Sequence, residues 1–170
     1  DPSGENVANG YSRYIITDLL REKYGFDGVV CTDWIITADN PNVEMMNGKP
    51  WGVEHLSVEE RHFQAIYAGC DQFGGNDDKQ PILAAYQLWC QRFGKESAEQ
   101  RFRASAQRLL LNFFRVGVFE NPYVDPNYTA QVVGCKEFVE EGYDAQLKSI
   151  VMLKNHQQVM PIKKGAKVYF

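Results

Sequence analysis

Residues 12–34, SRYIITDLLREKYGFDGVVCTDW, hold the pattern of a helix followed by a buried strand. A capping serine opens the segment, and apolar side chains then recur at helical spacing, which predicts a helix over residues 13–24. Gly25 is a natural C-terminal stop for that helix. The run VVCT at 29–32 shows no strict alternation, as is typical of a strand buried on both faces. Asp33 therefore follows the end of a predicted buried strand.

The chain beyond this segment repeats the order of loop, helix and strand. A polar stretch at 35–55 is too long for an ordinary connection, and loops of this kind are usually functional. Ser57 and Glu60 form the pattern of a capping box. The further predicted elements are helices at 58–68 and 81–93, a strand-like segment at 70–73, and a helix that Ser97 caps and that runs to residue 115. Strands about 40 residues apart with helices between them predict a parallel α/β architecture, whose chemistry lies at the carboxyl ends of the strands.

A second region begins after the turn-rich segment NPYVDP at 121–126. We expect a helix at 136–153 with a break near Gly142, and then a final strand at 166–170.

Composition and charge exclude two classes of partner. Eighteen basic and 22 acidic residues give a formal net charge of −4, and no basic run is long enough to follow a phosphate backbone, so we expect no nucleic-acid partner. No apolar stretch approaches the roughly 20 residues that span a bilayer, so we expect no membrane segment. No two of the four cysteines are spaced as Cys-x-x-Cys, and we expect all four to be buried free thiols.

The segment LREKYGFDGVVCTDW at 20–34 closely resembles the nucleophile block of the family-3 glycoside hydrolases, usually written L-R-x-x-x-G-F-x-G-x-V-x-S-D-W. Three further blocks follow in the family's order. They are AGCD at 68–71, RLL at 108–110 with GVFENPY at 117–123, and SIVMLKN at 149–155 with MPI at 160–162. Four ordered blocks argue against coincidence, and together they cover about residues 12–162.

The resemblance implies an α/β fold, in which this chain supplies the C-terminal portion of a (β/α)8-type barrel followed by the start of an α/β sandwich domain. Residues 1–122 then belong to the catalytic barrel, 123–135 to a linker, and 136–170 to the incomplete second domain. The family's nucleophile falls on Asp33. A carboxylate suits that role because it can attack the anomeric carbon, form a glycosyl ester and later leave. Without the surrounding block, Asp33 would be read as a strand-end carboxylate that caps a turn.

The predicted activity is that of a retaining, exo-acting β-glycosidase of the β-glucosidase or β-xylosidase kind, acting on an oligosaccharide or glycoside. Trp34 resembles the family's sugar-stacking residue, although a buried aromatic is the plainer interpretation. An aromatic residue there points away from the N-acetylglucosaminidase branch. No cofactor and no catalytic metal are expected. The alternative is a non-catalytic carbohydrate-binding or assembly relative on the same scaffold.

Two other groups of residues are weaker candidates. Asp71 belongs to the AGCD block and is interpreted as mainly structural, with a substrate contact as the alternative, because the following QFGG departs from the family's usual D-M. His55, Glu59 and His62 could suggest a metal site, but their spacing matches no zinc motif, so solvated or packed histidines are expected.

The resemblance also implies that the catalytic pair is incomplete in this chain, because the family's general acid lies on sequence outside it. We therefore expect the chain alone to be inactive and to expose apolar helix faces that the rest of the polypeptide, or another copy, would cover. The resemblance favours a periplasmic or secreted protein.

Overall fold

The structure is a computed structural model that describes residues 3–39 and 49–169. It divides into two compact units, Asp1–Glu120 and Asn121–Phe170. The predicted boundary lay at residue 122, and the assignment of the two regions to a barrel and a sandwich domain stays a prediction.

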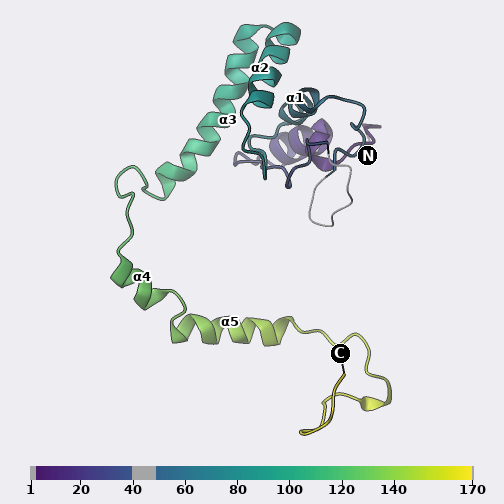
Figure 1. The fold of residues 1–170 in the computed structure, drawn as a ribbon, viewed down its shortest axis with the longest axis vertical. Helices are drawn as coiled ribbons and strands as arrows, with labels where there is room; N and C mark the ends of the chain where they lie inside the picture. Colours follow the sequence, from purple (N-terminus) through teal and green to yellow (C-terminus); the bar gives the residue numbers. More distant parts are fainter. Residues whose placement is uncertain (1–2, 40–48, 170) are drawn as a thin grey trace. The chain divides into compact units, whose positions relative to one another are not determined.

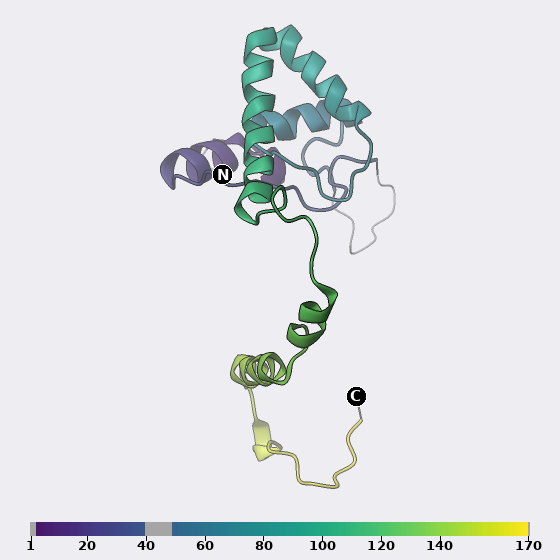
Figure 2. The same ribbon diagram turned by 90° about the vertical axis from the view of Figure 1, so that its left-hand side faces the viewer.

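The first unit is built around five helical segments (Figures 1 and 2). They are the 3-10 helix η1 (Asn9–Tyr11), the π-helix η2 (Tyr14–Lys23), and the α-helices α1 (Val58–Ala68), α2 (Gln80–Phe93) and α3 (Lys95–Arg115). The second unit contains α4 (Pro126–Val132), α5 (Lys136–Ser149) and the 3-10 helix η3 (His156–Gln158).

The helix predictions hold where local chemistry determines the ends. At the start of α1, Ser57 Oγ accepts the Glu60 N–H at 3.2 Å and the Glu60 carboxylate accepts the Ser57 N–H at 2.9 Å, so the predicted capping box is present. The helix predicted at 13–24 is present as η2, with Gly25 after it in the left-handed region at φ 69°.

Two helix predictions were wrong in detail. Helix α3 begins at Lys95 rather than after Ser97, because the Ser97 hydroxyl accepts the Trp89 indole N–H at 3.0 Å instead of capping the helix. Helix α5 runs unbroken through Gly142 and ends at Ser149, because a single exposed glycine weakens a helix without interrupting its hydrogen bonds.

The predicted strands at 29–32 and 70–73 appear as one isolated parallel bridge, between Cys31 and Gln72. The Thr32 N–H donates to the Gln72 carbonyl at 2.9 Å, and the Asp71 N–H donates to the Val30 carbonyl at 2.8 Å. Among residues 3–39 and 49–169, this bridge is the only β pairing. A longer ladder would need neighbouring strands on both edges of the pair. Residues 166–169 form no strand either. The wider α/β class stays a prediction.

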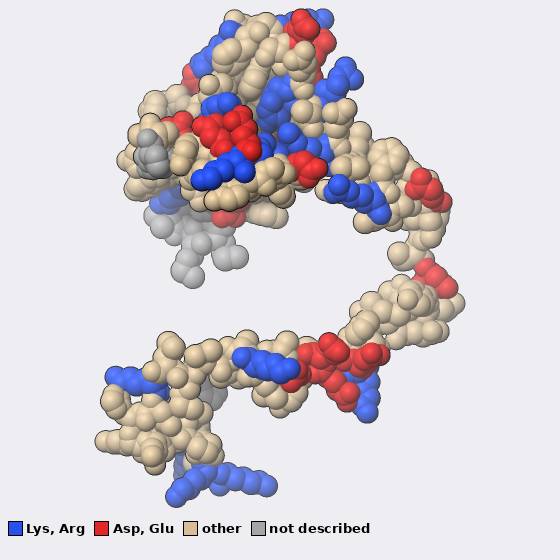
Figure 3. All heavy atoms as spheres, turned by 180° about the vertical axis from the view of Figure 1, so that it is seen from behind, with Lys and Arg blue, Asp and Glu red and all other residues tan. Residues whose placement is uncertain are grey.

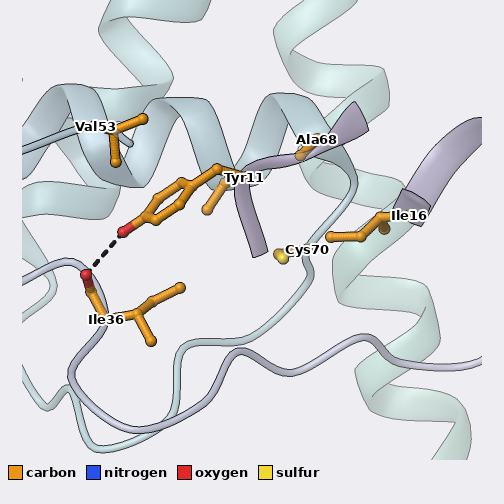
Figure 4. Packing of buried hydrophobic residues seen from close by; sticks show 7 residues of the cluster. Tyr11, Ile16, Ile36, Val53, Ala68 and Cys70 are labelled. Carbon is orange, nitrogen blue, oxygen red and sulfur yellow. Dashed lines mark hydrogen bonds between the residues drawn. The ribbon is translucent and has the colours of Figure 1, made fainter. Parts of the chain in front are cut away.

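Two apolar clusters hold the first unit together. Figure 4 shows Tyr11 of η1 at the centre of the first, where its hydroxyl donates to the Ile36 carbonyl at 2.8 Å. This cluster ties η1 and η2 to α1 and to the segments on either side of it, through Tyr11, Ile16, Ile36, Val53, Ala65, Ala68 and Cys70. The second cluster packs α1 against α2 and α3 through Phe63, Ile66, Ala85, Trp89 and Ala98.

The cysteine prediction is only partly right. All four cysteines are free, as expected, but Cys70 is the one that is buried, while Cys31 is exposed and Cys90 and Cys135 are half-buried. Burial raises the pKa of the Cys70 thiol to about 12, so this thiol is protonated and packs as a small apolar group.

The second unit keeps large apolar side chains on its surface, among them Phe138, Tyr143 and Leu147 on α5. The expectation that the rest of the polypeptide, or another copy, covers such apolar faces stays a prediction. Over the described residues, no helix combines the length and apolar character that crossing a membrane requires. Figure 3 shows basic and acidic side chains lying next to one another on one face of the first unit, not sorted into a large patch of one sign.

Candidate active site

Asp33 lies two residues after the bridged Cys31 and on the wall of a cavity of about 420 Å3. The side chain is exposed, and its Oδ1 accepts the Trp34 N–H at 2.7 Å. This bond joins adjacent residues and fixes the direction of the carboxyl group. The cavity wall includes Cys31, Ile36 and Lys49. The carboxyl group is therefore oriented by its own backbone and accessible from an open cavity.

Trp34 is 58% exposed, so it is not the buried aromatic of the plainer interpretation. Its indole lies against the backbone of Gly74 and Gly75, because an added Cβ on either glycine would fall within 2.8 Å of an indole atom. The sequence placed Asp33 and Trp34 side by side, and the structure adds the surface on which the indole rests. An exposed aromatic face beside a carboxylate is an arrangement suited to binding a sugar ring.

The turn that follows Asp33 is strained and is held by the loop after residue 71. Ile35 has a φ of 56°, which is costly for a β-branched side chain. The Ile35 N–H donates to the Gly74 carbonyl at 3.0 Å, and the Gly74 N–H donates to Thr32 Oγ1 at 3.0 Å. Residues on both sides of the Asp33–Trp34 pair are thus tied to Gly74.

A buried polar network supports the turn from α1. The His62 Nδ1–H donates to the Val58 carbonyl at 2.7 Å, which leaves Nε2 as an acceptor. Nε2 lies 3.0 Å from Asn76 Nδ2 and 3.2 Å from Thr37 Oγ1, and both of these groups can donate to it. This packing agrees with the expectation of a packed histidine. Among the described residues, no group of three or more His, Cys, Asp or Glu side chains is placed to hold a metal ion.

Burial lowers the pKa of His62 below its usual value, against the opposing effects of the Val58 carbonyl, Glu59 and Asp78. The unfolded chain then binds more protons than the folded chain between the folded pKa and about 6.5, so stability falls as the pH drops through that window.

We expect the thermal midpoint of the full-length protein to decrease as the pH is lowered from about 7.5 to about 5.5, and His62→Gln to remove part of that decrease. His55→Gln, at an exposed histidine outside this network, is the control variant. An identical pH dependence in His62→Gln and the unmodified protein would contradict this assignment.

Arg61 joins the two ends of the long polar loop. Its guanidinium donates to the Thr37 carbonyl at 3.3 Å, to the Glu54 carbonyl at 2.7 Å and to Asp39 at 2.6 Å. Sequence reasoning missed this role, because two of these three partners are backbone carbonyls, which no residue type marks. Residues 40–48 of the same loop lie outside the described residues.

Asp71 carries the densest set of contacts near the site. Its carboxylate is fully buried and accepts hydrogen bonds from Arg21 at 2.6 Å, Arg108 at 2.9 Å, Ser105 at 2.6 Å and the Val30 N–H at 3.0 Å. Burial favours the protonated form, but these hydrogen bonds and charges outweigh it and lower the pKa of Asp71. These contacts account for Asp71 as a structural residue that joins η2, α3 and the bridged segments.

Comparison with known proteins gives matches over most of the chain. A protein named periplasmic beta-glucosidase/beta-xylosidase from Dickeya chrysanthemi is 37% identical over 175 residues, covering 97% of this chain and 26% of that protein. The probable beta-glucosidase C of Aspergillus flavus is 40% identical, covering 94% of this chain and 24% of that protein. The beta-glucosidase C of Emericella nidulans is also 40% identical, with 94% and 25% covered. The chain is similar along most of its length to a segment of each of these proteins.

These relatives confirm the resemblance to glycoside hydrolases that the sequence motifs predicted. The chain spans about a quarter of the length of the relatives it matches. No protein-family model matches it. The roles of Asp33 and Trp34 stay predictions, to which the structure contributes their positions.

Proposed function

We propose that the full-length protein hydrolyses terminal β-glucosides or β-xylosides with retention of configuration, through a covalent glycosyl ester on Asp33. The observation that carries this proposal is the placement of Asp33: it lies two residues after Cys31 of the Cys31–Gln72 bridge, lines an open cavity, and has the exposed Trp34 beside it. The matching relatives named β-glucosidase or β-xylosidase support the class of substrate.

In the proposed mechanism, an Asp33 oxygen attacks the anomeric carbon while the bond to the leaving-group oxygen breaks. A carboxylic acid or histidine elsewhere in the protein protonates that oxygen, as the family resemblance implies. The same group then takes a proton from water, and the water oxygen displaces Asp33 from the anomeric carbon. The sugar leaves with its original configuration because the carbon has been inverted twice.

We also propose that the first unit is part of a (β/α)8-type barrel and that the second begins a sandwich domain. The parallel bridge between residues about 40 apart supports the barrel, because parallel neighbours joined through a helix are its basic unit. Asp33 and Asp71 both stand at this bridge, where barrel enzymes place their functional loops.

Hydrolysis of an aryl β-glucoside and an aryl β-xyloside by the full-length protein tests the proposed function. The configuration of the first sugar released, followed by NMR before it mutarotates, should be β for a retaining enzyme. Release of the α-anomer would disprove the covalent mechanism. Tight binding of the same sugars without turnover would favour the non-catalytic alternative.

Trp34→Ala in the full-length protein is expected to raise KM by about tenfold and to change kcat less for a substrate with a good leaving group. The physical reason is that the indole face binds the ground state and the transition state alike, so its loss weakens binding more than chemistry. Trp34→Phe should recover part of the binding, because it keeps an aromatic face. Kinetics that stay the same in Trp34→Ala would remove Trp34 from the sugar site.

A further inference from the structure

Gly74 and Gly75 lie against the Asp33–Trp34 pair so closely that neither has room for a side chain. A Cβ on Gly74 would lie 2.7 Å from the Thr32 carbonyl oxygen and 2.8 Å from Trp34 Cε3. A Cβ on Gly75 would lie 2.6 Å from Trp34 Cδ1 and 3.0 Å from Ile35 Cγ1. These separations are shorter than atoms in van der Waals contact allow, so the glycines set how near the two segments approach.

Both glycines touch the Trp34 indole, and Gly74 alone also touches the backbone of the site among its three nearest contacts. Gly74 meets the backbone just before Asp33, and it also accepts the Ile35 N–H and donates to the Thr32 hydroxyl. Gly75 meets only side chains among its three nearest contacts, and two of those three are indole atoms of Trp34. Both glycines therefore limit where the indole lies, and Gly74 also controls the backbone that carries the carboxyl group.

The strain in this turn makes such control necessary. Ile35 holds a left-handed φ of 56°, a conformation that persists only where the surroundings enforce it. The hydrogen bond from Ile35 to Gly74 and the indole contact with Gly75 supply that enforcement. Relaxation of the turn would move Trp34, and with it the N–H that orients Asp33 Oδ1.

We propose that Gly74 and Gly75 are positioning residues of this active site: Gly75 sets the plane of the Trp34 indole against which the sugar binds, and Gly74 sets the backbone that aims the Asp33 carboxylate. The inference rests on the proposed function, because it concerns the same reaction. The QFGG sequence, where the family usually has D-M, thus acquires a role: the two small residues leave the space that the indole fills.

Gly75→Ala in the full-length protein should raise KM by about tenfold with a smaller change in kcat, because the added methyl group displaces the indole. Gly25→Ala is the matched control, since Gly25 has nearly the same φ, 69° against 71°, but has nothing within 4 Å of an added Cβ. It carries the backbone strain without the indole contact and should leave KM unchanged. In a Trp34→Ala background, Gly75→Ala should no longer change KM.

Gly74→Ala should lower kcat by about a hundredfold, because small displacements of a reacting group are costly to the chemical step. It should also raise KM, because the added methyl group meets the indole as well. Gly28→Ala is its matched control: neither glycine has a left-handed φ, and the three nearest contacts of an added Cβ on Gly28 are all with the Phe26 ring. Gly28→Ala should leave kcat unchanged.

The Trp34 contribution to fluorescence, obtained by difference against Trp34→Phe, gives a readout that does not depend on activity. Its emission should shift in Gly75→Ala and stay in place in Gly25→Ala. The inference is overturned if the emission does not shift, if the KM penalty survives in the Trp34→Ala background, or if Gly74→Ala behaves like Gly28→Ala. Absence of Asp33-dependent hydrolysis in the unmodified protein is a different result, because it removes the proposed function itself and the inference with it.

Discussion

Asp33→Asn in the full-length protein is expected to lower kcat/KM for an aryl β-glucoside or β-xyloside by about four orders of magnitude or more, with little change in thermal stability. The amide keeps the shape of the side chain and can still accept the Trp34 N–H through its oxygen, so the local fold should survive. It cannot form the glycosyl ester, because a neutral amide is a far poorer nucleophile and gives no comparable leaving group. Steady-state kinetics and a thermal melt together measure the two halves of this prediction.

Asp27→Asn is the matched control for that substitution. Asp27 is exposed in the turn before the bridged segment and is not among the residues that line the Asp33 cavity, so its loss of charge should change kcat/KM less than twofold. A more specific test uses Asp33→Gly with added azide, a small anion that can occupy the vacated space and attack the same carbon. It should restore turnover and give an α-glycosyl azide, because one inversion replaces two. Turnover by Asp33→Asn within about tenfold of the unmodified protein would assign the nucleophile to another residue.

The parts of the fold that the sequence predicted well depend on local chemistry. Ser57 and Glu60 lie three residues apart and bond to each other, so the start of α1 could be read directly from their types. Residues 29–32 differ, because a strand exists only through its neighbours and these residues have one bridge to residue 72. Their β-branched pattern predicted a preference, and pairing determines whether a strand forms.

The candidate site also contains residues that the sequence predicted and residues that it could not predict. Asp33 and Trp34 were predicted from a continuous motif, which records their types and order but not their surroundings. The contacts that hold them come from residues about 40 positions later, Gly74 and Gly75, and the supporting network joins Thr37 to His62 and Asn76. No spacing rule links such residues, because their proximity depends on how the helices and loops pack. Only the unusual QFGG after Asp71 hinted that this loop differs.

Asp71→Asn is expected to destabilise the full-length protein by about 3–5 kcal/mol, the largest stability effect in this region. The carboxylate has no exposed surface and faces three guanidinium groups, those of Arg21, Arg101 and Arg108, at 2.6, 3.6 and 2.9 Å. Removing its charge leaves the three positive groups close together with no anion among them. Removal of one partner from a buried ion pair typically costs about 3–5 kcal/mol. The amide would also turn an N–H2 group toward donors, because Ser105 and the Val30 N–H both donate to this side chain.

Asp144→Asn isolates the contribution of burial. Asp144 also pairs with a cation, the Lys148 ammonium at 2.5 Å, but both side chains are more than half exposed, so the same substitution should cost less than about 1 kcal/mol. Urea unfolding of the two variants, followed by helical circular dichroism, measures the difference. Arg108→Gln should fall between them, because its side chain is partly exposed and two arginines remain to pair with Asp71. If the free energy of unfolding of Asp71→Asn lies within about 1 kcal/mol of that of the unmodified protein, the carboxylate is not what joins η2 to α3. The packing of α3 would then depend on the apolar cluster between α1, α2 and α3.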